Sequence, residues 1–265
     1  MNPQNVSEPA KLGERIAKRL SRAGLCSRRD AERWIAEGRV SVDGEVLQSP
    51  AFNVTEASRI EVDGKPLPVA ERARLWRYHK PPGEIVTARD PQGRKTIFES
   101  LPKGLPRTIA VGRLDFNSEG LLLLTNDGAL ARRLELPANG WTRRYRARVH
   151  GAVDEARLAA LAKGITIEGV RYGAIQASLD RQQRSNAWLN IALAEGKNRE
   201  VRRVLAHLEL TVVRLIRTAF GPFHLGELER GTVEEMPTQA LDNLLGVKTQ
   251  RKEGWAKPQG RKRRR

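Results

Sequence analysis

The sequence predicts an α+β protein with a small N-terminal α/β module, a short linker, a larger domain of strands mixed with helices, and a disordered basic tail. Helical spacing and then hairpin patterns occupy the first part of the chain, and a charged stretch with two prolines follows them. Beyond it, strands and helices do not alternate as in a doubly wound sheet. The expected segments are a disordered N-terminus (1–10), the module (11–65), the linker (66–74), the large domain (75–246) and the tail (247–265).

Two helices open the module. Apolar residues recur at helical spacing over 15–23, and Gly24 ends this first helix. Ser27 begins a second helix as a hydroxyl N-cap with Asp30 three residues later, and that helix ends at Gly38. Cys26, between the helices, is expected to be a small buried apolar residue.

Hairpin signals complete the module. Residues 40–42 and 45–47 flank an Asp43-Gly44 turn, and residues 60–64 repeat the pattern of a strand followed by Asp-Gly. The module is therefore expected to be two basic helices beside a small sheet.

Charge indicates a polyanionic partner. The chain carries 48 Lys and Arg against 31 Asp and Glu, a net charge of +17, with a pI near 10.8. One basic cluster lies over 11–33, on structured sequence, and a second over 248–265, where nine basic residues face one acid. The tail has too few apolar residues to fold alone, and we expect it to contact nucleic acid.

Several classes of protein are excluded. One cysteine rules out a disulfide framework and suits a reducing cytoplasm. The four histidines lack zinc-site spacing, so no metal is expected. No apolar run is long enough to span a membrane, and the polar N-terminus is not a signal peptide.

The large domain offers strand and helix patterns in mixed order. The strand candidates are Thr108–Asp115, Leu121–Thr125, Arg143–Val149 and Trp188–Ala194. The helix candidates are Ala129–Leu134, Asp154–Lys163, Asn198–Leu208 and Thr238–Leu245.

Residues 111–128 are the most informative stretch. A strand is expected to end in the carboxylate of Asp115, a polar loop follows, and an apolar strand then leads to an Asn-Asp-Gly turn. A carboxylate on a loop held by rigid strands suits catalysis, although a turn-capping role is the alternative. Asp127 fits turn and helix-entry chemistry. Asp115 and Glu119 form only a weak match to a glycosidase carboxylate pair.

Two basic segments accompany this loop. Arg199, Arg202 and Arg203 follow a Gly turn at a helix start, where guanidinium groups can grip phosphate or a carboxylate. Residues 143–146 form a basic strand with one aromatic ring, a mixture that suits a stacked base and its phosphates.

The module resembles the RNA-binding domain of ribosomal protein S4 type. The shared positions are Arg15, Lys18, Leu20, Ala23, Gly24, Ser27, Arg28, Arg29, Ala31, Gly38, Val40, Val42 and Gly44. The resemblance implies that the two-helix face meets RNA through Arg15, Lys18, Arg19, Arg22, Ser27, Arg28 and Arg29.

The remaining motifs resemble the ribosomal RNA pseudouridine synthases of the RsuA/RluB/RluE/RluF family, especially the RluB-like large-subunit (23S) group. The motifs are Tyr78-His79-Lys80-Pro81-Pro82-Gly83, Asp90-Pro91-x-Gly93-Arg94, Gly112-Arg113-Leu114-Asp115, Gly120-Leu121-Leu122-Leu123-x-Thr125-Asn126-Asp127-Gly128, Arg143-x-Tyr145, Glu195-Gly196-x-Asn198-Arg199-x-Val201-Arg202-Arg203, and Gly221-Pro222 with Leu225-Gly226. Ser118, Arg143 and Glu200 depart from the usual Thr, Lys and Gln.

The resemblance implies a catalytic domain with a mixed, largely antiparallel sheet flanked by helices. It implies that Asp115 is the catalytic aspartate, that Tyr145 lies against the target base, and that Arg202 pairs with Asp115. Arg113, Arg143, Arg199 and Arg203 are then expected to bind RNA.

This chemistry agrees with what the sequence lacks. Isomerising uridine to pseudouridine needs no redox group, energy donor or metal, so no cofactor is expected. It needs an ionised carboxylate and a flipped-out nucleotide. The expected protein is a cytoplasmic, monomeric enzyme acting on ribosomal RNA. The alternatives are a non-catalytic ribosome assembly factor and, less favoured, a DNA-binding helix-turn-helix protein.

Overall fold

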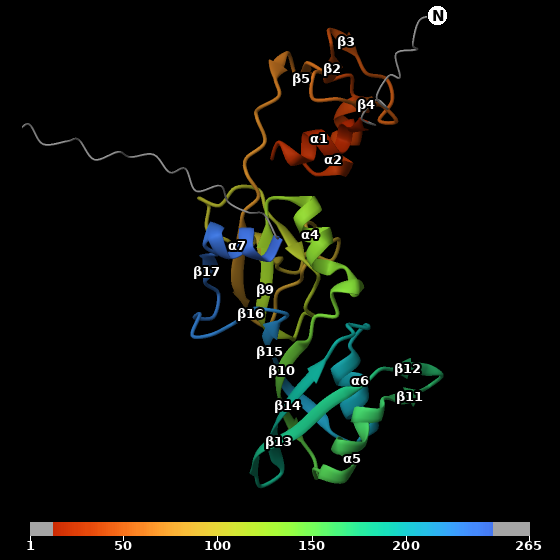
Figure 1. Ribbon diagram of the computed structural model, residues 1–265, viewed down its shortest axis with the longest axis vertical. Helices are drawn as coiled ribbons and strands as arrows, with labels where there is room; N and C mark the ends of the chain where they lie inside the picture. The colour runs from red at the N-terminus through yellow and green to blue at the C-terminus, as the bar shows by residue number, and fades with distance from the viewer. Residues whose placement is uncertain (1–12, 246–265) are drawn as a thin grey trace, which may run out of the picture.

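The chain folds into an elongated molecule with the module at one end. The computed structural model describes residues 13–245, so the expected disordered N-terminus and basic tail lie outside the described residues. Figure 1 shows the module above the large domain, joined to it by one chain segment. One ion pair between the two, from Arg89 to Asp30, spans 3.7 Å.

The module matches the pattern expected from its sequence. Helices α1 (Ile16–Arg22) and α2 (Arg28–Ala36) pack on a four-stranded sheet. That sheet has the order β3 (Glu45–Val46), β2 (Val40–Val42), β5 (Ile60–Val62), β6 (Lys65–Pro66), and β1 (Glu14–Arg15) pairs separately with β4 (Asn53–Val54). Ser27 and Asp30 form a reciprocal capping box that starts α2, as predicted. Cys26 is buried in this core, also as predicted.

A nine-stranded sheet forms the frame of the large domain, and its mixed, largely antiparallel character is confirmed. Its main path is β13 (Ile175–Gln183), β14 (Asn186–Leu193), β10 (Arg143–His150), β15 (Thr211–Phe220), β9 (Glu119–Thr125), β7 (Leu75–Lys80), β17 (Val233–Glu235), with β16 (Phe223–His224) on β15 and β8 (Ile109–Val111) on β9. Among these described strands only β15 and β9 pair in parallel.

Two expected boundaries are wrong in the region that matters for function. Strand β8 ends at Val111, so Asp115 lies in the following loop and not at the end of a strand. Helix α6 (Glu200–His207) starts two residues later than predicted, because Arg199 adopts a left-handed conformation with φ of 51°. Strands β7, β13, β15, β16 and β17 of this sheet were not among the predicted strands.

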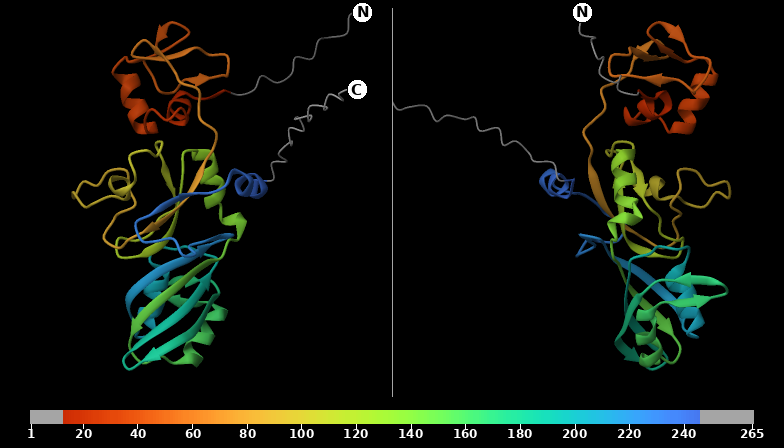
Figure 2. Two further views of the ribbon diagram at one scale, coloured as in Figure 1. Left: turned by 90° about the vertical axis from the view of Figure 1, so that its left-hand side faces the viewer. Right: turned by 45° about the vertical axis from the view of Figure 1, so that its right-hand side comes forward.

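Helices cover the two faces of the sheet unequally. Helices α5 (Glu155–Ala160) and α6 pack on one face of β10, β13 and β14, while α4 (Gly128–Glu135) and α7 (Thr238–Leu245) pack on the opposite face, over β7 and β9. The remaining elements are helix α3 (Ile97–Ser100), the 3-10 turns Pro137–Asn139 and Leu161–Lys163, and the hairpin β11 (Ile165–Ile167) and β12 (Val170–Tyr172). The left-hand view of Figure 2 shows the strands of the lower half in front of their helices, with the outer face of these strands uncovered.

Gly120 permits the single parallel contact of the sheet. Its φ is +106°, and a Cβ added there would lie 2.4 Å from the carbonyl oxygen of Arg217 on β15. Only glycine fits such a close approach of two backbones. This contact places β15 beside the strand that follows the Asp115 loop.

Candidate active site

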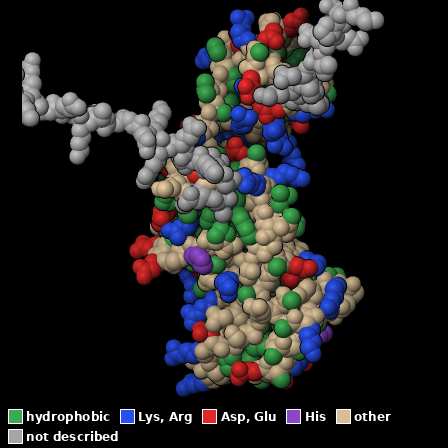
Figure 3. All heavy atoms as spheres, in the orientation of Figure 1, with side chains coloured by type: hydrophobic (Ala, Val, Ile, Leu, Met, Phe, Trp, Pro, Cys, Tyr) green, Lys and Arg blue, Asp and Glu red, His purple; other side chains and the backbone are tan. Residues whose placement is uncertain are grey.

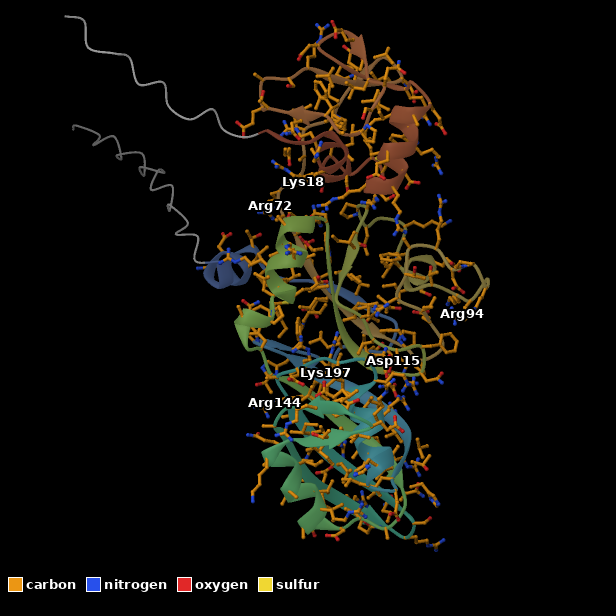
Figure 4. All side chains as sticks on the ribbon, turned by 90° about the vertical axis from the view of Figure 1, so that its right-hand side faces the viewer. Lys18, Arg72, Arg94, Asp115, Arg144 and Lys197 are labelled. Atoms are coloured by element: carbon orange, nitrogen blue, oxygen red, sulfur yellow. The ribbon has the colours of Figure 1, made fainter. Side chains whose placement is uncertain are left out.

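A cleft of about 1490 Å³ opens on the face of the sheet that carries α6. Its walls include the 85–107 segment, the loop between β8 and β9, and the start of α6. Asp115, Tyr145, Lys197, Arg199, Arg202 and Arg217 all line it. Figure 4 shows Asp115 and Lys197 at the junction between the upper and lower halves of the large domain. This volume exceeds that of a typical small-molecule pocket, which leaves room for a nucleotide with its flanking phosphates.

Asp115 presents a partly accessible carboxylate to this cleft. Its side chain is 29% exposed, and Arg199 lies 3.8 Å from its Oδ2. The backbone N–H of Ser118 donates to the Asp115 carbonyl at 3.0 Å, which closes the loop into a turn. The carboxylate therefore lies at the cleft surface on a constrained loop, beside one guanidinium group.

The predicted ion pair between Arg202 and Asp115 is not formed, and Arg199 takes that place. Arg202 donates instead to the carbonyl of Asn117 at 3.0 Å and to that of Val212 at 3.3 Å. Burial lowers the pKa of Arg202, Arg199 lowers it further, and the charge of Asp115 opposes both effects. Arg202 lies in the first turn of α6 and binds one backbone carbonyl of the loop after Asp115 and one of β15.

Lys80, for which the sequence predicted no role, binds the backbone of the Asp115 loop. Its ammonium group is fully buried and donates to the carbonyls of Pro81, Phe116 and Ser118 at 2.8, 3.3 and 3.0 Å. Burial lowers the pKa of Lys80 to about 8, opposed by the carboxylates of Glu84, Asp115 and Glu119. The cation thus joins the end of β7 to both sides of the turn that follows Asp115.

Tyr145 and Arg217 form the floor of the cleft. They face each other across β10 and β15, and the Tyr145 side chain is half-buried between two of the apolar clusters. Arg217 is 4% exposed, donates its Nε to the carbonyl of Leu121 at 2.8 Å, and has an Nη2 without a hydrogen-bond partner among the described residues. Burial lowers the pKa of Arg217, and the neighbouring Tyr145 hydroxyl opposes this shift. The sequence signal for this residue is an arginine among apolar neighbours, in a strand that also carries Arg214.

Glu200 is a second buried ionisable group in the cleft wall. Its Oε2 accepts the backbone N–H of Lys197 at 2.8 Å, while its Oε1 is buried without a partner among the described residues. Burial raises the pKa of this carboxyl, and the nearby Glu195 adds to the rise. The Glu that replaces the usual Gln therefore places a poorly solvated carboxyl group in the cleft wall.

We expect Glu200→Gln to stabilise the protein at neutral pH by about 1 kcal/mol, since it removes a poorly solvated charge and retains an oxygen for Lys197. A raised native pKa means that the folded state binds more protons than the unfolded state above pH 4.5. The gain should therefore be present at pH 7–8 and vanish as pH falls toward 4.5. Thermal unfolding across this range measures it.

Glu195→Gln is the control, and its effect on stability should have the opposite sign. Hydrogen bonds from Lys197 and Gly173 lower the pKa of Glu195, so its removal should destabilise at neutral pH, with the difference shrinking in acid. If Glu200→Gln lowers the melting temperature at pH 8, Glu200 is favourably solvated and this account of its burial is wrong.

The basic residues predicted to bind RNA through the module are placed in three ways. Lys18, Arg19 and Arg22 converge on the carboxylate of Glu14 at 3.3, 3.3 and 3.4 Å. The hydroxyl of Ser27 serves the capping box of α2, and Arg28 points toward Gly128 of the large domain. Arg15 and Arg29 are exposed and have no ion pair with a described residue.

The residues of the large domain that were predicted to bind RNA also lie in different environments. Arg113 and Arg143 line the cleft, but Arg143 is held by the carbonyls of Trp141 and Ala194. Arg203 lies on the exposed side of α6 and is not part of the cleft wall, which separates it from Arg199 and Arg202.

Residues 13–245 contain neither a cluster of metal ligands nor a helix that could span a membrane. Within 13–245, no three His, Cys, Asp or Glu side chains converge as metal ligands. No helix in this part of the chain combines the length and apolar character needed to cross a bilayer.

Comparison with known families defines the class of this protein. Residues 74–207 match the RNA pseudouridylate synthase family, and residues 14–60 match the S4 domain. The chain belongs to the RNA pseudouridine synthases, which are isomerases, and it carries an N-terminal S4 domain that binds RNA.

Individual relatives narrow the comparison. An uncharacterized RNA pseudouridine synthase of Rickettsia felis is 47% identical over 86% of this chain and 99% of its own. The ribosomal large subunit pseudouridine synthase B of Yersinia pestis is 41% identical over 88% of this chain and 76% of its own. A crystal structure of a pseudouridylate synthase superposes with a TM-score of 0.60 at 26% identity, covering 87% of this chain and 99% of that one.

Proposed function

We propose that this enzyme converts one uridine of cytoplasmic 23S ribosomal RNA to pseudouridine, with Asp115 as the catalytic carboxylate. The observation that carries the proposal is the position of Asp115, on a braced loop at the surface of a nucleotide-sized cleft. The likeness to the large-subunit enzyme of Yersinia pestis supports the choice of RNA.

The groups of the cleft suit the steps of this isomerisation. The N1–C1′ bond of uridine breaks, the base turns, and C5 bonds to C1′. C5 then loses its proton, and N1 gains one. A carboxylate at Asp115 can attack the ribose or the base or take a ribose proton, and the target must first leave its helix. The Tyr145 ring offers a surface for the flipped base. Arg113 and Lys197 supply positive charge for its phosphates.

The test is direct detection of the product. Purified protein is incubated with unmodified 23S transcript, and pseudouridine is mapped by chemical derivatisation and reverse transcription. We expect one strong position in 23S RNA and none in 16S RNA. Modification of 16S RNA alone would overturn the choice of subunit, and absence of product from both RNAs would overturn the proposal.

Arg202 and Arg199 should differ in how they contribute. Arg202→Ala removes two hydrogen bonds to backbone carbonyls, so we expect a loss of about 1–2 kcal/mol in stability and about tenfold in turnover. Arg199→Ala removes only a long, exposed ion pair with Asp115, so its melting temperature should be unchanged. Thermal unfolding and single-turnover rates of both variants test this. Equal effects would show that the Arg202 contacts to the loop do not matter.

A further inference from the structure

The large domain has a second basic surface on the side of the sheet opposite the cleft. Side chains alternate along β10, so Tyr145 points into the cleft while Arg144, Arg146 and Arg148 point the other way. Arg214 lies opposite Arg148 on β15, and Arg181 on β13 lies opposite Trp188 of β14. These five arginines with Trp188 are called here the outer basic face.

This face is uncovered in the described part of the chain. Helices α5 and α6 pack on its reverse side, and α4 and α7 lie over the upper strands. Figure 3 shows Lys and Arg side chains along the left-hand edge of the lower half, with acidic side chains higher on that edge. In Figure 4, Arg144 and Asp115 lie on opposite sides of the large domain. A nucleotide in the cleft therefore cannot also contact this face.

Two of the arginines are held in place around Trp188. The Arg146 guanidinium lies 4.6 Å from the Trp188 ring centre and pairs with Asp180 at 2.6 Å. Arg214 lies 6.0 Å from the same ring and is fixed by the buried carboxylate of Glu119. These contacts order the centre of the face, which lowers the entropy lost when a partner binds.

The other three arginines are available to a partner. Arg144, Arg148 and Arg181 are exposed, and none of them forms an ion pair with a residue in 13–245. Arg144 and Arg148 share one face of β10 with Arg146, so basic residues repeat at every second position, about 6.8 Å apart. Two members of this row, Arg144 and Arg148, are unpaired, and guanidinium groups spaced in this way can contact the phosphates of a nucleic-acid strand.

We propose that the outer basic face binds a second segment of the substrate RNA, beyond the segment that enters the cleft. The proposal rests on the assignment of the enzyme to ribosomal RNA, because only a long folded RNA can reach both sides of the sheet. The face then adds affinity for the large RNA without contributing to the chemical step. A single stem-loop bound in the cleft does not contact the outer basic face.

The experiment compares two variants that lose the same charge. The face variant is Arg144→Gln/Arg148→Gln/Arg181→Gln, and the matched control is Lys65→Gln/Arg132→Gln/Lys163→Gln, from exposed sites elsewhere. Affinity is measured over a salt series for a domain-length 23S transcript and for a single stem-loop taken from it. Circular dichroism confirms that both variants are folded.

For the domain-length RNA, we expect the face variant to bind about tenfold more weakly at 0.15 M salt, with its salt slope shallower by about 2, while the control stays near wild type. Stem-loop affinity and single-turnover rate should not change. Equal losses in the two variants, a loss on the stem-loop as well, or no loss at all would overturn the proposal; the last result would leave an acidic protein as the alternative partner. The salt slopes remain readable even if wild-type protein forms no pseudouridine, so failure of the proposed function is distinguishable.

Discussion

Asp115→Asn should reduce the single-turnover rate more than 100-fold while RNA affinity stays within a few-fold of wild type. The substitution removes the anion that the isomerisation requires but keeps the shape of the side chain. It also disrupts little structure, since the ion pair of Asp115 with Arg199 spans 3.8 Å. A 100-fold loss corresponds to about 2.7 kcal/mol of activation free energy. Rates are measured at saturating RNA, so that a change in binding does not enter them.

Asp154→Asn is the matched control for this variant. Asp154 caps α5 through the backbone N–H groups of Ala156 and Arg157, a role that asparagine also fills, and it is not part of the cleft wall. Its rate should equal that of wild type. Turnover of Asp115→Asn above about 1% of wild type would contradict the assignment of Asp115 as the catalytic carboxylate.

The features that the sequence predicted well depend on residues close together in the chain. The capping box of α2 spans four positions, from Ser27 to Asp30, and the Asp43-Gly44 turn needs only its two flanking strands. Asp127, which was expected at a helix entry, caps α4 by accepting the N–H groups of Ala129 and Leu130. In each case, the hydrogen bonds that decide the structure are local.

The geometry of the cleft could not be predicted in this way, because its contacts join distant segments. Arg202 was expected to pair with Asp115, but its partners are set by how α6 docks against β15 and the Asp115 loop. The left-handed turn at Arg199 shifts the start of α6 and brings Arg199 to the carboxylate instead. Arg217 reaches the cleft only because β15 enters the middle of the sheet, beside Gly120.

Lys80 is the clearest example of such a long-range role. It lies within a motif that the sequence singled out, yet two of its three acceptors are 36 and 38 positions further along the chain. These acceptors are the carbonyls of Phe116, the residue after Asp115, and of Ser118, the last residue of the turn. The position of the Asp115 carboxylate therefore depends on a buried cation that lies outside the cleft wall.

Lys80→Met should lower turnover about 100-fold, because a loop displaced by about 1 Å misplaces the Asp115 carboxylate. Its effect on stability should be smaller. Lowering the pKa of Lys80 from 10.5 to about 8 costs about 3 kcal/mol, and the variant escapes this cost while losing three hydrogen bonds to carbonyls. We expect a net loss on the order of 2 kcal/mol in stability. Single-turnover rates and thermal unfolding measure the two effects separately.

To separate the positioning of the Asp115 loop from a loss of stability, the single-turnover rates of Lys80→Met and wild type are compared well below the melting temperature of the variant. Lys163→Met is the control. Lys163 is exposed, lies outside the cleft wall and should tolerate the same substitution without effect. If Lys80→Met only destabilised the fold, its rate would recover on cooling as the folded fraction approached one. If Lys80 positions the loop, the fully folded variant stays slow while its RNA affinity remains close to that of wild type, because the groups facing the RNA are intact. A fully folded Lys80→Met protein with the wild-type rate would show that the Asp115 loop holds its geometry without the buried ammonium group.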